Sequence, residues 1–243
     1  MSIVRHIPNA ITSANLFSGA TGVYLALVGR PDLTAYCILL AALFDFMDGF
    51  AARLLKAYSD IGKDLDSLAD LVSFGVAPAA VLSSLVHFSL TGEWSGLFMS
   101  LNFSQQVLIL LPFLLVVFSA LRLAKFNNDQ RQSENFIGLT TTATGMFVVS
   151  LVYLVFNEGG SLLLFANPWI VLTLVMIFSA LLVSEIPMFS LKFKSFGWKG
   201  NENRYMLLLL SLFAIIFVQV AALAIIIPIY ILYSIILCLV KRE

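Results

Sequence analysis

Six aspartates fall between residues 45 and 70 of a chain whose remaining sequence is strongly apolar. Asp60 and Asp64 are expected to be solvated or helix-starting acids in a polar connector. The other four lie inside or next to stretches apolar enough to be embedded in a membrane. Ionised groups there are costly and mark a functional site with a definite partner. These four are Asp45, Asp48, Asp66 and Asp70.

The spacing of these four acids predicts that they meet. Asp45 and Asp48 are three residues apart, and Asp66 and Asp70 are four apart, so in helices each pair shares a face. The two helices are neighbours in sequence, joined by a short polar connector around residues 57–64. A helical hairpin therefore brings both carboxylate pairs together near one membrane interface.

Four clustered carboxylates cannot all stay ionised without compensation. Protons could neutralise them, basic side chains could pair with them, or divalent cations could bind between them. Only Arg53 and Lys56 share the helix face of the first pair, and they lie one to two turns nearer the connector. Hard oxygen ligands in such a group are typical of Mg²⁺ or Mn²⁺ sites. Two such ions sharing carboxylates are typical of phosphoryl displacement.

Small residues interleave with the first acidic pair. Gly49 and Ala52 lie on the same helix face and leave room for a bulky ligand to approach the backbone, and Arg53 one turn on can grip a phosphate. The alternative is ordinary packing of transmembrane helices, with acids paired to bases. Four acids at matched spacing with Gly, Ala and Arg between them favour the metal and phosphate interpretation.

The elements that must position these residues are membrane-spanning helices. The chain has 243 residues, of which 60% are hydrophobic and 12% are charged, about half the charged fraction of a soluble domain. We expect an all-α integral membrane protein, a polytopic bundle of about eight transmembrane helices forming one domain over residues 1–243. Its core would cover about 7–190, with two additional C-terminal helices in 204–240. The predicted spans are 8–28, 33–56, 65–90, 104–125, 138–157, 167–190, 204–220 and 223–240.

Charge predicts the orientation of the bundle. Of the 14 Lys and Arg residues, only Arg30 falls in the connectors of one side, around 29–32, 91–103, 158–166 and 221–222. The positive-inside rule then places both termini and the aspartates on the cytoplasmic side of the cell (inner) membrane. The formal net charge is zero, so no nucleic-acid partner is indicated.

The acidic region resembles the signature of the CDP-alcohol phosphotransferase family, which are integral membrane enzymes. Eight fixed positions over 26 residues make the match specific. The resemblance implies transfer of a phosphatidyl or related group from a CDP-linked lipid to a hydroxyl, with release of CMP, by a homodimer. The matching string is Asp45-x2-Asp48-Gly49-x2-Ala52-Arg53-x8-Gly62-x3-Asp66-x3-Asp70.

The resemblance also implies residue roles. Asp45, Asp48, Asp66 and Asp70 would ligate two ions, Mg²⁺ or Mn²⁺, and Asp70 would in addition take the proton of the acceptor hydroxyl. The CDP portion would be held by the remaining positions, with the start of the first span closing over the nucleotide. These positions are Asp48, Gly49, Ala52, Arg53, Ser59 and Gly62, with Pro8, Asn9 and Thr12.

The flanking sequences narrow the acceptor. "IPNAITSANLFSGA" at 7–20, "GKDLDSLADLVSFGVAPA" at 62–79 and "FIGL" at 136–139 are similar to the branch of the family that uses L-serine and CDP-diacylglycerol. One departure follows "FIGL": where that branch commonly has prolines and small residues, this chain has "TTTAT" at 140–144. Candidate acceptor or phosphate ligands are Arg122, Lys125 and Asn127 at the cytoplasmic end of the fourth span. Glu185 falls within the sixth predicted span.

Two other functions stay open at this point. One is another branch of the same family, a phosphatidylglycerophosphate- or phosphatidylinositol-type synthase. The other is a divalent-cation transporter, which would place acids near the bilayer midplane along a polar path. The clustering of the acids toward one interface disfavours the transporter. Membrane lipids are the expected surroundings in every case.

Overall fold

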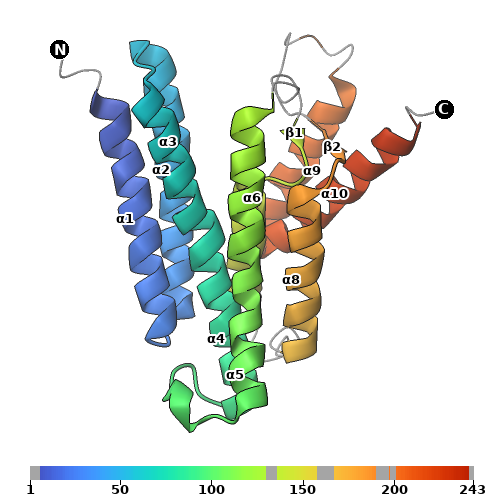
Figure 1. Cartoon of the computed structure of the whole chain (residues 1–243). Coiled ribbons are helices and arrows are strands. Elements are labelled where there is room, and N and C mark those ends of the chain that lie inside the picture. The colour runs from blue at the N-terminus through green and yellow to red at the C-terminus, as the bar shows by residue number, and fades with distance from the viewer. Residues whose placement is uncertain (1–5, 130–135, 158–166, 190–196, 198–200, 241–243) are drawn as a thin grey trace.

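The structure is a computed structural model that describes residues 6–129, 136–157, 167–189, 197 and 201–240. It is an all-α bundle in which helices occur within each predicted range (Figure 1). The helices are α1 (Ile7–Leu27), α2 (Pro31–Leu55), α3 (Asp60–Asp70), α4 (Ala77–Thr91), α5 (Phe103–Leu110), α6 (Leu114–Asn128), α7 (Thr141–Asn157), α8 (Pro168–Val183), α9 (Glu202–Val218) and α10 (Leu223–Val240). Shorter segments are the π-helical η2 (Leu71–Val76) and the 3₁₀ turns η3 (Phe98–Ser100), η4 (Leu111–Phe113) and η7 (Gln219–Ala222).

Several helical segments join into longer rods. α3, η2 and α4 run on from Asp60 to Thr91, and α5, η4 and α6 from Phe103 to Asn128. Both rods, and the stretch Arg204–Leu239, are long and apolar enough to cross a membrane, while α7 and α8 are shorter apolar helices. The chain is thus an integral membrane protein. The count of about eight crossings and the cytoplasmic placement of both termini stay predictions.

Small side chains let α1 pack closely on its neighbours. A Cβ added to Gly19 would lie 2.2 Å from the hydroxyl oxygen of Ser73 in η2, so no larger residue fits there without a shift. Between α1 and α2, the Thr34 hydroxyl donates to the carbonyl of Gly22 (2.9 Å). Such small contact residues are typical of close helix packing in membranes. As a result the start of α1 lies beside the α2–α3 turn, at one end of the bundle (Figure 1).

The end of α8 differs from the sequence prediction. The helix ends at Val183, and Glu185 lies in the following link, so its predicted place within the sixth span is wrong. Proline disfavours helical geometry in the residue before it, and Pro187 starts β2 (Pro187–Met188), which pairs antiparallel with β1 (Phe136–Ile137). Gly138, with φ of +76°, donates its backbone N–H to the carbonyl of Ile186 (2.9 Å) and completes this junction.

The core of the bundle lies around α4, with η2, α7 and α8 packed against it. Its largest fully buried side chains include Phe74, Leu85, Leu151 and Leu182. By contrast, α9 keeps large apolar side chains exposed, as expected of a lipid-facing helix.

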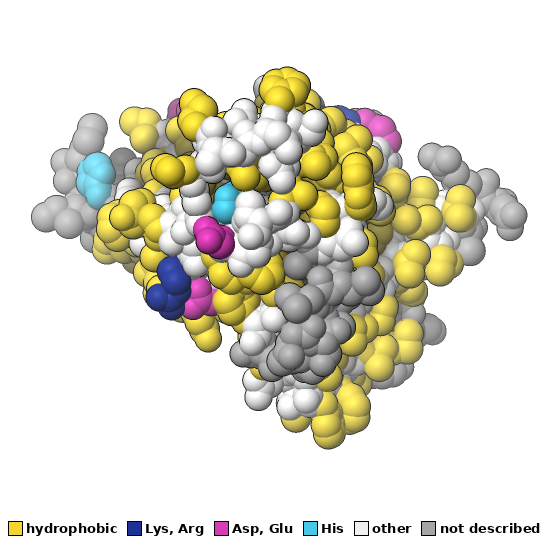
Figure 2. Space-filling view, turned by 90° about the horizontal axis from the view of Figure 1, so that it is seen from below, with side chains coloured by type: hydrophobic (Ala, Val, Ile, Leu, Met, Phe, Trp, Pro, Cys, Tyr) yellow, Lys and Arg dark blue, Asp and Glu magenta, His cyan; other side chains and the backbone are white. Residues whose placement is uncertain are grey.

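The end opposite the α2–α3 turn carries little charge. Seen from that end, the surface shows mainly hydrophobic and uncharged polar side chains (Figure 2). Arg30, the one cation assigned to this side, forms a two-point pair with Asp32, with Nε–Oδ1 2.9 Å and Nη2–Oδ2 2.8 Å. The hydrogen bond from Arg30 lowers the pKa of the Asp32 carboxyl. This cation is thereby neutralised locally, in keeping with a side poor in free positive charge.

Candidate active site

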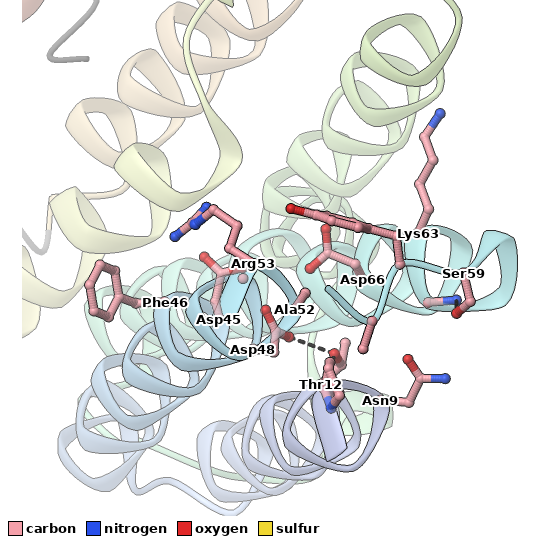
Figure 3. A pocket seen from close by; sticks show the side chains of 15 residues that line it. Asn9, Thr12, Asp45, Phe46, Asp48, Ala52, Arg53, Ser59, Lys63 and Asp66 are labelled. Carbon is pink, nitrogen blue, oxygen red and sulfur yellow. Dashed lines mark hydrogen bonds between the residues drawn. The ribbon is translucent and has the colours of Figure 1, made fainter. Parts of the chain in front are cut away.

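Three of the four embedded aspartates form a compact triad. Asp45 and Asp48 on α2 and Asp66 on α3 each offer a carboxylate oxygen, and these oxygens all lie within 4.8 Å of one another. Asp48 is buried, and the other two are half-buried. Figure 3 shows the three carboxyl groups directed into the same space. The helical spacing predicted from the sequence thus brings these three acids together.

The turn between α2 and α3 sets the geometry of the hairpin. Lys56 ends α2 in the left-handed conformation, with φ of +49°. The chain then turns back, and the hydroxyl of Ser59 accepts a hydrogen bond from the backbone N–H of Gly62 (3.0 Å), capping α3. A serine N-cap satisfies a helix donor that otherwise lacks a partner. This cap fixes where α3 begins and therefore where Asp66 faces α2.

Thr12 of α1 holds one member of the triad. Its hydroxyl donates to Asp48 Oδ2 at 2.6 Å and lies 3.0 Å from the carbonyl oxygen of Pro8 (Figure 3). Thr12 and Asp48 are 3% and 6% exposed, so this bond is shielded from water. Hydrogen bonds to a charged acceptor are short and strong in such surroundings. Thr12 therefore orients the Asp48 carboxylate from outside the hairpin.

A cleft of about 450 Å³ opens over the triad. All nine residues that the sequence assigned to the CDP portion line it, from Pro8 in α1 to Gly62 in α3. The sequence interpretation missed four further lining residues that neighbour the motif along the chain. These are Phe46, Ala57, Tyr58 and Lys63.

Arg53 supplies a cation to this cleft. Its guanidinium lies over Gly49, where an added Cβ would be 3.7 Å from Nη1. The side chain is exposed and lies beside Asp45 and Asp48 in Figure 3. A planar, exposed guanidinium next to open space is well suited to a two-point bond with a phosphate.

The triad lacks the basic partners that ordinary packing would require. Among the described residues, the ion pairs join Arg30 to Asp32 and Lys125 to Glu185, and neither includes a triad member. Three carboxylates at this separation repel one another unless protons or cations compensate. A partly buried, oxygen-only ligand set beside an open cleft suits a hard divalent cation such as Mg²⁺ or Mn²⁺.

Asp70 lies one turn beyond Asp66 and outside the triad. Its Oδ1 atom is shielded from solvent and has no hydrogen-bond partner among the described residues. Arg122 of α6 is close enough to interact electrostatically with Asp70, and its guanidinium lies over the ring of Phe126, 4.9 Å from the centroid. Arg122 is only 6% exposed. The deeper end of the site thus combines a carboxylate and a buried cation.

The two other acceptor candidates have partners in the structure. Lys125 forms an ion pair with Glu185 in the link after α8. The Asn127 side chain donates to the Ser67 hydroxyl (2.8 Å), and its backbone carbonyl accepts from the ammonium of Lys63 (3.2 Å). Asn127 thus ties the end of α6 to α3.

The sequence is similar to a family of known enzymes over the region that forms the cleft. A model of the CDP-alcohol phosphatidyltransferase family matches residues 5–184. The chain is 34% identical over 150 residues to a Bacillus subtilis protein named CDP-diacylglycerol–serine O-phosphatidyltransferase, covering 62% of this chain and 77% of that protein. A Helicobacter pylori protein of the same name is 30% identical over 235 residues, 94% of this chain and 89% of that protein. A Saccharomyces cerevisiae protein of that name is 36% identical over 166 residues, 62% of this chain and 54% of that protein.

Proposed function

The chain belongs to the CDP-alcohol phosphatidyltransferase family, and from this we propose that it transfers the phosphatidyl group of CDP-diacylglycerol to the hydroxyl of L-serine, releasing CMP. The observation that carries the proposal is the compact triad of Asp45, Asp48 and Asp66 under a cleft that also holds Arg53. The names of the relatives and the sequence flanks support L-serine as the acceptor.

The cleft residues hold the donor lipid in this proposal. Arg53 binds the diphosphate, since it lines the cleft and its exposed guanidinium lies beside Asp45. Gly49 and Ala52 have small or no side chains, so the nucleotide can approach the backbone of α2. Asn9 and Ser59 flank the opening and offer polar atoms to the cytidine and its ribose.

Asp45, Asp48 and Asp66 hold the divalent cations, Mg²⁺ or Mn²⁺, and Asp70 completes the ligand set. When bound, two such cations neutralise the charge that the diphosphate carries on both sides of the scissile bond. The protein's own contribution is orientation. The Thr12 hydrogen bond and the helix positions fix the carboxylates before substrate arrives.

Asp70 acts as the general base. The acceptor hydroxyl oxygen forms a bond to the phosphorus of the phosphatidyl group, and the bond from that phosphorus to the bridging oxygen of the diphosphate breaks. CMP leaves with that electron pair, and the hydroxyl proton goes to the Asp70 carboxylate. A positioned base contributes ~10²–10⁴-fold to such a step. Arg122 lies close to Asp70 and binds the carboxylate of the acceptor.

The basic connectors indicate on which side of the membrane the enzyme acts. We place the site at the cytoplasmic face of the cell membrane, because the positive-inside pattern puts the basic connectors there. Both substrates are then within reach: the lipid from the membrane and L-serine from the cytosol. A homodimer is the expected assembly.

An acceptor screen tests the proposed function. The full chain, purified in detergent, is given CDP-diacylglycerol with Mn²⁺ or Mg²⁺ and one acceptor at a time: L-serine, glycerol 3-phosphate or inositol. We expect CMP release to match phosphatidylserine formation and to depend on L-serine. Release driven by glycerol 3-phosphate or inositol instead would reassign the chain to another branch of its family.

Asp70→Asn tests the general base. We expect a loss of at least ~10²-fold in CMP release, because the amide cannot take the proton. The matched control is Asp64→Asn, an exposed acid on the same helix α3 that is outside the cleft lining. Full activity of Asp70→Asn, in protein whose unfolding temperature is normal, would remove Asp70 from this role.

A further inference from the structure

Six buried side-chain polar atoms lack hydrogen-bond partners among the described residues. Three of these atoms are Asp70 Oδ1 of α3, Arg122 Nε of α6 and Thr141 Oγ1 of α7. Buried polar groups in folded proteins are nearly always paired, so each exception calls for an explanation. Two of the three belong to the proposed active site, whereas Thr141 has no role in it.

Helix geometry places Thr141 opposite Asp70. Gly145 of α7 lies against Phe74 of η2, since a Cβ on Gly145 would be 3.1 Å from Phe74 Cδ1. Thr141 precedes Gly145 by four residues and Asp70 precedes Phe74 by four, and residues four apart lie on nearly the same helix face. If α7 and the α3–η2–α4 rod run in the same direction, Thr141 and Asp70 therefore face each other.

Aromatic contacts at the far end fix that direction. Phe156, near the end of α7, stacks on Trp94 with ring centroids 4.9 Å apart. Trp94 in turn stacks on Phe88, near the end of α4, at 4.2 Å. The start of α7, at Gly145, contacts Phe74, and its end, at Phe156, lies near Phe88 through Trp94. Since Phe74 precedes Phe88 in the α3–η2–α4 rod, α7 and this rod run parallel. Thr141 thus lies at the level of Asp70, at the acidic end of the bundle.

Arg122 reaches the same level from a third helix. Ser119 of α6 lies against Gly75, where an added Cβ would be 3.1 Å from Ser119 Cβ. Arg122 follows Ser119 by three residues on the same face of α6, one turn nearer the acidic end. Its interaction with Asp70 agrees with that position. The three unpartnered atoms therefore come from helices that surround one point, one turn deeper in the bundle than Asp66.

The Thr141 hydroxyl is not needed to start its helix. Thr140 performs that task, because its hydroxyl accepts the backbone N–H of Ala143 (3.2 Å). Thr141 is 0% exposed, so bulk solvent does not reach its hydroxyl. Within the described residues the Thr141 hydroxyl thus keeps an unused donor.

We propose that Thr141 is part of the acceptor-binding site, where its hydroxyl and the Arg122 guanidinium bind the carboxylate of a hydroxy amino acid. The three atoms offer two donors, Thr141 O–H and Arg122 Nε–H, and one acceptor, Asp70 Oδ1. L-Serine is the complement: its carboxylate accepts two hydrogen bonds and its hydroxyl donates one to Asp70. This inference rests on the proposed function, in which Arg122 binds the acceptor carboxylate, and adds Thr141 as a second residue that binds it.

Thr141→Val tests the proposal, because valine keeps the shape and removes only the hydroxyl. With the full chain in detergent, we expect the KM for L-serine to rise at least tenfold while the KM for CDP-diacylglycerol stays unchanged. The preference for L-serine over ethanolamine, which lacks the carboxylate, should fall by the same factor. Thr141→Ser, which restores the hydroxyl, should recover most of the affinity for L-serine.

Ser179→Ala is the matched control. Its hydroxyl in α8 is equally buried and likewise has no partner among the described residues, and the proposal gives it no ligand. We expect normal kinetics for this variant, and neither variant should unfold at a lower temperature, since each loses an unpaired buried hydroxyl.

The activity of the wild-type chain with L-serine distinguishes failure of the Thr141 role from failure of the proposed function. If it uses L-serine and Thr141→Val leaves the KM for L-serine and the preference over ethanolamine unchanged, the role of Thr141 is refuted while the proposed function stands. A lower unfolding temperature with unchanged KM would likewise show a purely structural role. If the wild-type chain releases no CMP with L-serine, both fail together.

Discussion

Replacing Thr12 by valine removes one hydrogen bond from the acidic triad and leaves the shape of the side chain unchanged. The lost bond is the 2.6 Å contact from the Thr12 hydroxyl to Asp48 Oδ2, buried on both sides. Asp48 then keeps its charge but loses the donor that orients it. We expect the variant to fold and to need a higher concentration of divalent cation for activity.

The size of the effect follows from the environment of the bond. A hydrogen bond to a charged group contributes about 1.5–3 kcal/mol, which corresponds to roughly 10- to 150-fold in a binding constant. Loss of a partner that orients a metal ligand typically costs 10–100-fold in metal affinity or activity. The half-saturating Mn²⁺ concentration should therefore rise by about one to two orders of magnitude.

Two measurements check this expectation. CMP release is followed across a Mn²⁺ titration. The unfolding temperature is measured with and without Mn²⁺, because a ligand that binds only the folded state stabilises it more at a given concentration when its Kd is lower. The matched control is Thr21→Val, on the same helix, whose hydroxyl donates only to the carbonyl of Phe17 (2.8 Å). If Thr12→Val and Thr21→Val need the same Mn²⁺ concentration, Thr12 does not support the triad.

Three further changes probe other parts of the structure. Gly19→Ala forces a methyl group to within 2.7 Å of the Cα atom of Ser73, and such overpacking should lower the free energy of unfolding by about 1–3 kcal/mol in a thermal or denaturant titration. Arg53→Lys keeps the charge but loses the two-point fork, so the KM for CDP-diacylglycerol should rise about tenfold with the KM for L-serine unchanged. Lys125→Gln breaks the exposed pair with Glu185, and the unfolding temperature should move by less than about 4 °C.

Local spacing was enough to predict the centre of the site. Asp45 and Asp48 share a face by helical periodicity, and a short connector leaves Asp66 few positions other than opposite them. The same periodicity could not reveal the bond from Thr12 to Asp48, since 36 residues separate them and only the packing of α1 brings them together. The resemblance assigned Thr12 to the nucleotide, and that role stays a prediction; the structure adds that its hydroxyl donates to a carboxylate of the triad.

Sequence patterns alone could not predict the part of the site around Asp70. Thr141 joins Asp70 and Arg122 only because three helices converge, and the run "TTTAT" stood out in the sequence merely as a departure from a family pattern. The misplaced end of the sixth span has a local cause instead. Pro187 signals that the helix ends before it, but the apolar composition of 167–190 conceals that signal.

The π-helical segment η2 sets the direction in which the acidic residues of α3 face relative to the buried residues of α4. A turn with i→i+5 bonds holds about one residue more than an α-turn, so η2 takes up one extra residue between α3 and α4. Winding 71–76 as an α-helix of the same length would swing Asp66 and Asp70 by about 100° about the rod axis relative to α4, whereas deleting one residue within 71–76 would restore α-geometry and leave both helices facing as they do now. The direction in which the carboxylates face is therefore encoded separately from the packing that anchors the rod.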